Sequence, residues 1–290
     1  MIGFCGLELA HRVINGSGTF DALAARRCFG DSVIRSFPFA AFVSKTITLA
    51  PRQGNPPPRL WETPAGMINS IGLPNRGLAG YLEHDLPGLV ELGVPIITNV
   101  MGSTADEFAE LVEALVGEPA VAAIELNVSC PNVQTGLDIG ADPRELEALV
   151  ARVRPRWGRP LIVKLTPNTS DVAAAAAAAE AAGADAVSLI NTLRAMAIDR
   201  RSGAPWLGGR FGGLSGPAIR AVALAQVSAV AERVEIPIVG MGGVSRGRDA
   251  ADLLAAGATL VAVGTESFRD PSAGARIARE LADISPQNAG

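Results

Sequence analysis

Short apolar runs alternate along the whole chain with longer segments whose apolar residues recur at helical spacing. The apolar runs fall at residues 13–17, 40–46, 95–100, 121–128, 160–166, 185–190, 236–240 and 259–265. They are dense in branched aliphatic residues, as expected for strands that are buried on both faces of a parallel sheet. Eight strands that alternate with helices predict a (β/α)8 TIM barrel, and the pattern continues without a change in composition, which predicts a single domain over residues 1–290.

Several helix boundaries have local signals. Asp142 is placed to cap a helix over 143–156 that begins with Pro143, and Thr104 has a glutamate three residues later at the start of another helix. Residues 171–182 are nearly all alanine, which favours a helix that serves only as scaffold. Further helices are expected over 78–92, 217–233 and 247–256.

Three segments interrupt the regular alternation. Residues 4–9 and 12–14 predict a short hairpin before the first barrel strand. Residues 49–76 are rich in proline and glycine but also contain large apolar side chains, so we expect an ordered flap rather than a disordered loop. A second long loop is expected from residue 191 to residue 213. We expect long loops to cover the C-terminal mouth of the barrel.

Polar residues gather where the predicted strands end. Ligands bind at the C-terminal ends of the strands in parallel α/β sheets, so these residues are the candidate site. An isolated cysteine is usually a packing residue, but the polar neighbours of Cys130 favour a reactive thiol. The strand ends present Ser17, Lys45, Asn99, Asn127, Cys130, Lys164, Asn191, Thr192, Gly242, Gly243, Gly264 and Thr265.

The types of residue at the strand ends indicate the ligand. Glycines after the last two strands match the phosphate site of many barrels, where backbone N–H groups face the anion. A lysine at the end of an apolar strand needs an anion, a carbonyl group or an electron-rich ring, and Lys45 and Lys164 both occupy such a position. The asparagines offer the donors and acceptors that suit the amide edges of a planar heterocycle.

Composition narrows the class of partner. The net charge of -4 and the pI near 5.4 offer no basic field for nucleic acid or an anionic membrane. The three cysteines match neither a disulfide framework nor a metal-binding spacing, which favours a cytoplasmic protein, and the two histidines are isolated. The sequence contains no run of about 18 apolar residues for a membrane span, and no fingerprint for a dinucleotide or a Walker A loop.

Three motifs resemble those of class 1 dihydroorotate dehydrogenases. They are Glu-Leu-Asn-Val-Ser-Cys-Pro-Asn at 125–132, Asn-Ser-Ile-Gly-Leu-Pro-Asn at 69–75 and Gly-Met-Gly-Gly-Val at 240–244. A cysteine at 130, where class 2 has serine, supports class 1. The segments 52–56, 99–104 and 212–217 are most similar to subtype 1B. One difference follows the first motif, where residues 133–140 lack the Gly-Gly pair and the Phe-Gly that the family usually has.

The resemblance implies an FMN enzyme of pyrimidine (UMP) biosynthesis that oxidises dihydroorotate to orotate, with Cys130 as the general base. It implies a substrate set of Lys45, Asn69, Ser70, Ile71, Gly72, Leu73, Asn127, Asn191 and Thr192. It implies an FMN set of Ser17, Lys45, Thr46, Asn99, Asn127, Lys164, Ile190, Gly216, Gly242, Gly243, Gly264 and Thr265. It also implies a homodimer or a heterotetramer with an electron-transfer subunit that carries FAD and a [2Fe–2S] cluster.

Three other functions are compatible with the residues. A dihydropyrimidine dehydrogenase acting on uracil or thymine would share the fold and the cysteine, but such enzymes tend to have histidine at the position of Asn132. A barrel lyase would use Lys45 or Lys164 as a Schiff-base amine. A flavin-binding module without turnover is the third.

Overall fold

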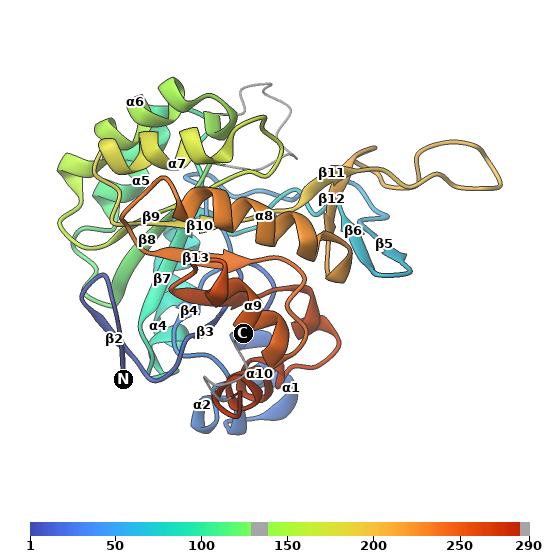
Figure 1. Cartoon of the computed structure of the whole chain (residues 1–290), viewed down its shortest axis with the longest axis horizontal. Helices are drawn as coiled ribbons and strands as arrows, with labels where there is room; N and C mark the ends of the chain where they lie inside the picture. Colours follow the sequence, from blue (N-terminus) through green and yellow to red (C-terminus); the bar gives the residue numbers. More distant parts are fainter. Residues whose placement is uncertain (129–138, 285–290) are drawn as a thin grey trace.

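The computed structural model describes residues 1–128 and 139–284, and its centre is a barrel of parallel strands (Figure 1). The barrel strands are β3 (Val13–Asn15), β4 (Phe42–Val43), β7 (Ile96–Val100), β8 (Val121–Asn127), β9 (Leu161–Lys164), β10 (Ala186–Leu189), β13 (Ile238–Met241) and β14 (Leu260–Val263). They are ordered β3-β14-β13-β10-β9-β8-β7-β4. The amide of Ala40 donates to the carbonyl oxygen of Val13 at 3.0 Å, which brings the two edge strands together. The predicted (β/α)8 barrel is confirmed.

Helices surround the barrel and connect its strands. The α-helices are α1 (Ala22–Phe29), α2 (Ser32–Arg35), α3 (Gly77–Gly80), α4 (Leu86–Val90), α5 (Ala105–Ala114), α6 (Pro143–Val153), α7 (Val172–Ala181), α8 (Arg220–Ala231), α9 (Gly247–Ala255) and α10 (Ala273–Ala282). The 3-10 turns are η2 (Ile139–Ala141), η3 (Arg154–Arg156), η4 (Pro217–Ile219) and η5 (Thr265–Phe268). Among the described residues, no helix is both long enough and apolar enough to cross a membrane.

The predicted N-caps are confirmed. The side chains of Thr104 and Asp142 accept hydrogen bonds from backbone N–H groups in the first turns of α5 and α6. Asp171, which was not predicted as a cap, does the same for α7. The helix predicted over 78–92 is wrong in one respect, because a π-helical turn, η1 (Tyr81–Asp85), separates α3 from α4. Pro87 has no N–H to donate at the start of α4, which favours a break in the regular ladder at this point.

The N-terminal hairpin is real but is shifted from the predicted position. Strand β1 (Ile2–Phe4) pairs with β2 (Leu7–Leu9), so residues 12–14 do not take part. The turn uses Cys5 and Gly6, both with positive φ, as a two-residue hairpin loop requires. Phe4 and Leu9 pack with Ile14 and Ile97 in the apolar interior of the barrel, so the hairpin closes the end opposite the strand termini.

A second sheet stands beside the mouth of the barrel and projects away from it (Figure 1). Its strands are β5 (Leu60–Thr63), β6 (Gly66–Asn69), β11 (Leu193–Ala195) and β12 (Gly212–Ser215), in the order β11-β12-β6-β5. The prediction that residues 49–76 form an ordered flap is therefore confirmed. The second loop, predicted to be irregular, contains β11 and the start of β12. Strand β11 pairs with β12, and β12 pairs with β6 of the flap.

Candidate active site

A cavity of about 460 Å³ lies at the C-terminal ends of the barrel strands, with the second sheet forming part of its wall. This volume is within the usual range for small-molecule sites, about 300–1,000 Å³. Most of the residues predicted for the site line it: Ser17, Lys45, Thr46, Asn69, Ile71, Leu73, Asn127, Lys164, Ile190, Asn191, Thr192, Gly216, Gly242, Gly243, Gly264 and Thr265. The structure therefore brings together residues from seven strand ends and from the flap.

Three predicted residues do not line the cavity, and Cys130 lies outside the described residues. Asn99 is fully buried, and its amide donates to Glu125 at 2.5 Å beneath the cavity floor. Ser70 donates to the carbonyl oxygen of Phe211. Gly72 has a φ of 73°, and a Cβ there would lie 2.5 Å from the amide nitrogen of Asn55. Ser70 and Gly72 thus stabilise the flap.

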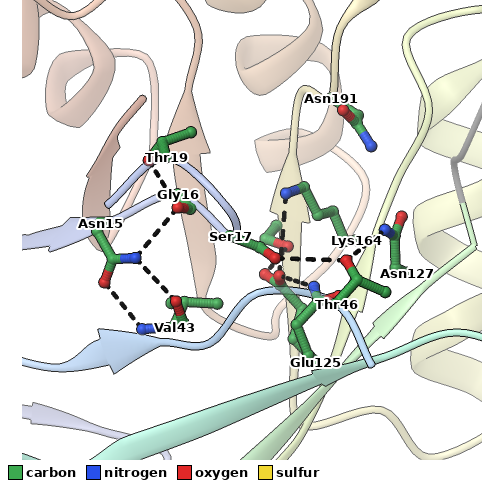
Figure 2. A network of polar contacts seen from close by, with 12 residues as sticks. Asn15, Gly16, Ser17, Thr19, Val43, Thr46, Glu125, Asn127, Lys164 and Asn191 are labelled. Carbon is green, nitrogen blue, oxygen red and sulfur yellow. Dashed lines mark hydrogen bonds and ion pairs between the residues drawn. The ribbon is translucent and has the colours of Figure 1, made fainter. Parts of the chain in front are cut away.

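Lys164 contributes a buried cation to the floor of the cavity. It ends β9 and is 6% exposed, and its Nζ lies 4.0 Å from a carboxylate oxygen of Glu125 on β8 (Figure 2). Glu125 also accepts a hydrogen bond of 2.7 Å from Ser188. Glu125 is not among the residues predicted for the site, although a charged residue inside the apolar run 121–128 is a signal that the sequence contains.

Polar side chains from three strand ends meet beside Lys164 (Figure 2). Asn127 is the Cα partner of Lys164 across β8 and β9, and its amide donates to Thr46 Oγ1 at 3.1 Å. Ser17 donates to the carbonyl oxygen of Ser44 at 2.8 Å. These bonds fix an amide and two hydroxyls beside the ammonium of Lys164 on one wall. Such a set suits a planar ring with alternating donors and acceptors.

Lys45 is a second cation at the cavity. The protein around it removes water from the ammonium, which lowers the pKa of Lys45, and the charge of Asp21 offsets part of this effect. An anion held near Lys45 would raise that pKa again, because opposite charges favour each other's charged forms. The position therefore suits a carboxylate or phosphate ligand.

The loops after β13 and β14 present backbone N–H groups to the cavity. Within the described residues, the amides of Gly243, Gly264 and Thr265 donate to no acceptor. All three residues line the cavity. Such uncommitted N–H groups fit a phosphate group. Together with Lys164, they make the described part of the cavity a suitable match for FMN.

A network of side chains holds these two loops, and two of its members, Ser245 and Glu266, also line the cavity. Asp249 on α9 accepts from the backbone and the hydroxyl of Ser245, and it pairs with Arg220. Burial would raise the pKa of Asp249, but the Ser245 hydrogen bonds and the charge of Arg220 outweigh it and hold that pKa below its usual range. Arg276 on α10 donates to the carbonyl oxygen of Ser245 and pairs with Glu266. No local pattern in the sequence predicts this network, because its members come from four separate segments.

Comparison with known proteins identifies the family. The family model described as dihydroorotate dehydrogenase matches residues 2–284. The chain belongs to the dihydroorotate dehydrogenase family. Members of this family are flavin-dependent oxidoreductases.

Three relatives of the dihydroorotate dehydrogenase family illustrate the similarity, and each is named as the catalytic subunit of dihydroorotate dehydrogenase B (NAD(+)). The protein of Citrifermentans bemidjiense is 46% identical over 97% of this chain and 91% of its own length. That of Desulforudis audaxviator is 46% identical over 97% and 90%. That of Pelobacter propionicus is 47% identical over 97% and 91%. The resemblance to the B subtype found in the sequence is therefore confirmed.

Proposed function

We propose that this chain is the catalytic subunit of a B-type dihydroorotate dehydrogenase, which oxidises dihydroorotate to orotate in pyrimidine biosynthesis. The observation that carries the proposal is the placement of Lys164, Asn127 and the uncommitted amides of two loops around one cavity. The relatives support the substrate and the subtype through their names. Their agreement favours dihydroorotate over uracil or thymine, and over a Schiff-base reaction.

FMN is the cofactor that the cavity fits. Bound FMN would supply a hydride acceptor, which none of the protein's own side chains provides. The amides of Gly243, Gly264 and Thr265 would hold its phosphate, and the ammonium of Lys164 would favour negative charge on its ring. Thr46 and Asn127 would orient the same ring through their fixed hydrogen bond.

The substrate would lie between the cofactor and the flap. Lys45 would bind its carboxylate, and the amides of Asn69, Asn127 and Asn191 would bind its ring amides. This arrangement orients C5 and C6 of dihydroorotate for the removal of a proton and a hydride, which yields the double bond of orotate. The residues of β6 contribute to both the sheet and the cavity wall, so substrate binding and flap position are linked.

Cys130 is the proposed base that takes the proton from C5. The residue lies outside the described part of the chain, so its role rests on the motif at 125–132. A thiol acts as a base through its thiolate, and a pKa near neutrality makes that form accessible. Hydrogen bonds to the carbonyl group next to C5 would stabilise the enolate that forms.

One spectroscopic experiment tests both the cofactor and the substrate. The purified chain should show a flavin absorption band that bleaches anaerobically when dihydroorotate is added. Dihydrouracil is the matched control and should leave the band unchanged. A chain that takes up no FMN on reconstitution, or a band that bleaches only with dihydrouracil, would contradict the proposal.

We further propose that reoxidation by NAD requires a partner subunit carrying FAD and a [2Fe–2S] cluster. The chain has no dinucleotide fingerprint and no cysteines at cluster spacing. The isolated chain should therefore bleach with dihydroorotate yet reduce NAD very slowly, and an artificial dye should restore turnover. Rapid NAD reduction by the homogeneous chain would exclude this arrangement.

A further inference from the structure

A carboxylate lies in the barrel interior directly below the cavity, although the proposed reaction has no step for it. Glu125 is 3% exposed, and it is not among the described residues that line the cavity. Burying a carboxylate is unfavourable unless nearby groups compensate its charge. The partners of Glu125 therefore indicate its role.

Each oxygen of Glu125 has its own hydrogen-bond donor. Asn99 Nδ2 donates to Oε1 at 2.5 Å, and Ser188 Oγ donates to Oε2 at 2.7 Å. Both donors are fully buried, and they come from β7 and β10. Hydrogen bonds to an ionised carboxylate are short and strong, so these two bonds fix the group in place and stabilise its charge.

The contact with Lys164 is of a different kind. Its Nζ lies 4.0 Å from Oε1, which is close enough for an ion pair but too long for a hydrogen bond (Figure 2). Both side chains are more than nine-tenths buried. Glu125 therefore compensates the charge of Lys164 without accepting one of the ammonium hydrogens, while Lys164 itself lines the cavity.

We propose that Glu125 is a positioning residue that acts through Lys164, holding the ammonium at the cavity floor and reducing the positive charge that the cavity presents to its ligand. The inference rests on the proposed function for the identity of that ligand, FMN. Two-electron reduction gives a flavin that carries additional negative charge at neutral pH. An ion pair stabilises that charge less than a lone lysine does, so Glu125 lowers the reduction potential of the bound cofactor.

The variant Glu125→Gln tests this, because it removes the charge and keeps the size and polarity. Asn99 Oδ1 is buried with no hydrogen-bond partner among the described residues, so rotation of that amide would offer an acceptor to the new N–H₂ group. We expect the ratio of reduced to oxidised flavin at a fixed potential to rise about tenfold, an upward shift of about 30 mV in a dye-coupled titration.

Ser188→Ala is the matched control. It removes the 2.7 Å hydrogen bond to Glu125 but keeps the carboxylate, so the midpoint potential should stay within about a twofold change in that ratio. A structural role alone would affect the stability of both variants and the potential of neither. A potential for Glu125→Gln that equals the wild-type value or lies below it would overturn the proposal.

A double variant covers the case in which Glu125→Gln folds poorly. Removing one member of a buried pair leaves an uncompensated charge, whereas removing both is often tolerated. Adding Lys164→Met should then restore the thermal unfolding temperature of the flavin-free chain, and a failure to restore it would overturn the pairing. If the wild-type chain binds no FMN, the proposed function fails, whereas this thermal comparison still tests the ion pair separately.

Discussion

The guanidinium of Arg276 on α10 donates a hydrogen bond of 3.1 Å to the carbonyl oxygen of Ser245, in the loop that follows β13. The same group pairs with Glu266 at 3.0 Å, in the turn that follows β14. One side chain thus ties together the two loops that we propose for phosphate binding, and it does so from outside the described lining of the cavity.

Arg276→Met should therefore weaken the binding of FMN by about tenfold, the effect of losing one or two charged hydrogen bonds. Riboflavin lacks the phosphate, so its affinity should change little. Quenching of flavin fluorescence on titration into the flavin-free chain measures both constants. Arg279→Met is the control, because among residues 1–128 and 139–284 the side chain of Arg279 donates only to the carbonyl oxygen of Ala275 on its own helix. Equal losses for FMN and riboflavin would show that Arg276 does not act through the phosphate loops.

Gly243 is needed by the protein's own packing as well as by any ligand. Its φ is 75°, and a Cβ there would lie 2.8 Å from the Cβ of Arg220 and 2.9 Å from the carbonyl oxygen of Gly216. Gly243→Ala should lower the stability of the flavin-free chain by about 2–4 kcal/mol, from the left-handed backbone and the crowding together.

Gly203→Ala isolates the backbone contribution to that loss. Gly203 has a φ of 71°, but no atom lies within 4 Å of the position that a Cβ would take, so its substitution should cost only about 1–2 kcal/mol. Chemical denaturation of both variants gives the comparison. Equal stability losses would mean that the contacts with Arg220 and Gly216 relax at no cost.

Asp249 should make stability depend on pH. Its folded-state pKa lies below the ordinary value of 3.8, so the folded protein binds fewer protons at this site than the unfolded chain. The resulting stabilisation is present above about pH 3.8 and is lost as the pH falls through the folded-state pKa. Asp249→Asn should thus be less stable than wild type at pH 6, and the difference should shrink below pH 4 in thermal unfolding. Asp106→Asn, which removes an exposed ion pair with Arg152, should change little at either pH.

Cys130→Ser distinguishes a base from a packing residue. A hydroxyl ionises at much higher pH than a thiol, so flavin reduction by dihydroorotate should slow by about 10²–10⁴-fold near neutral pH. FMN content and orotate binding should stay close to wild type, and the residual rate should rise over a higher pH range. Stopped-flow absorbance measures the rate, with Cys28→Ser, at an exposed position on α1, as the control. An unchanged rate would assign Cys130 to packing.

The sequence by itself determined the barrel and half of the described residues that line the cavity. Apolar runs of strand length, helix caps such as Asp142 and polar strand ends such as Asn127 and Lys164 are local signals, and a parallel sheet places all strand ends on one side. The order of the barrel strands follows from the same alternation, because each strand–helix unit places its next strand beside it.

Only the tertiary structure decided which side chains affect the cavity indirectly, by holding other residues in place. Asn99 shares the strand-end pattern of Asn127, yet it lies one layer deeper and orients Glu125. Arg276 reaches Ser245 across 31 residues, and β12 pairs with β6 although more than a hundred residues separate them in the chain. Periodicity reports the local conformation of the backbone, whereas these contacts depend on how distant elements pack, which a single sequence does not encode in any local pattern.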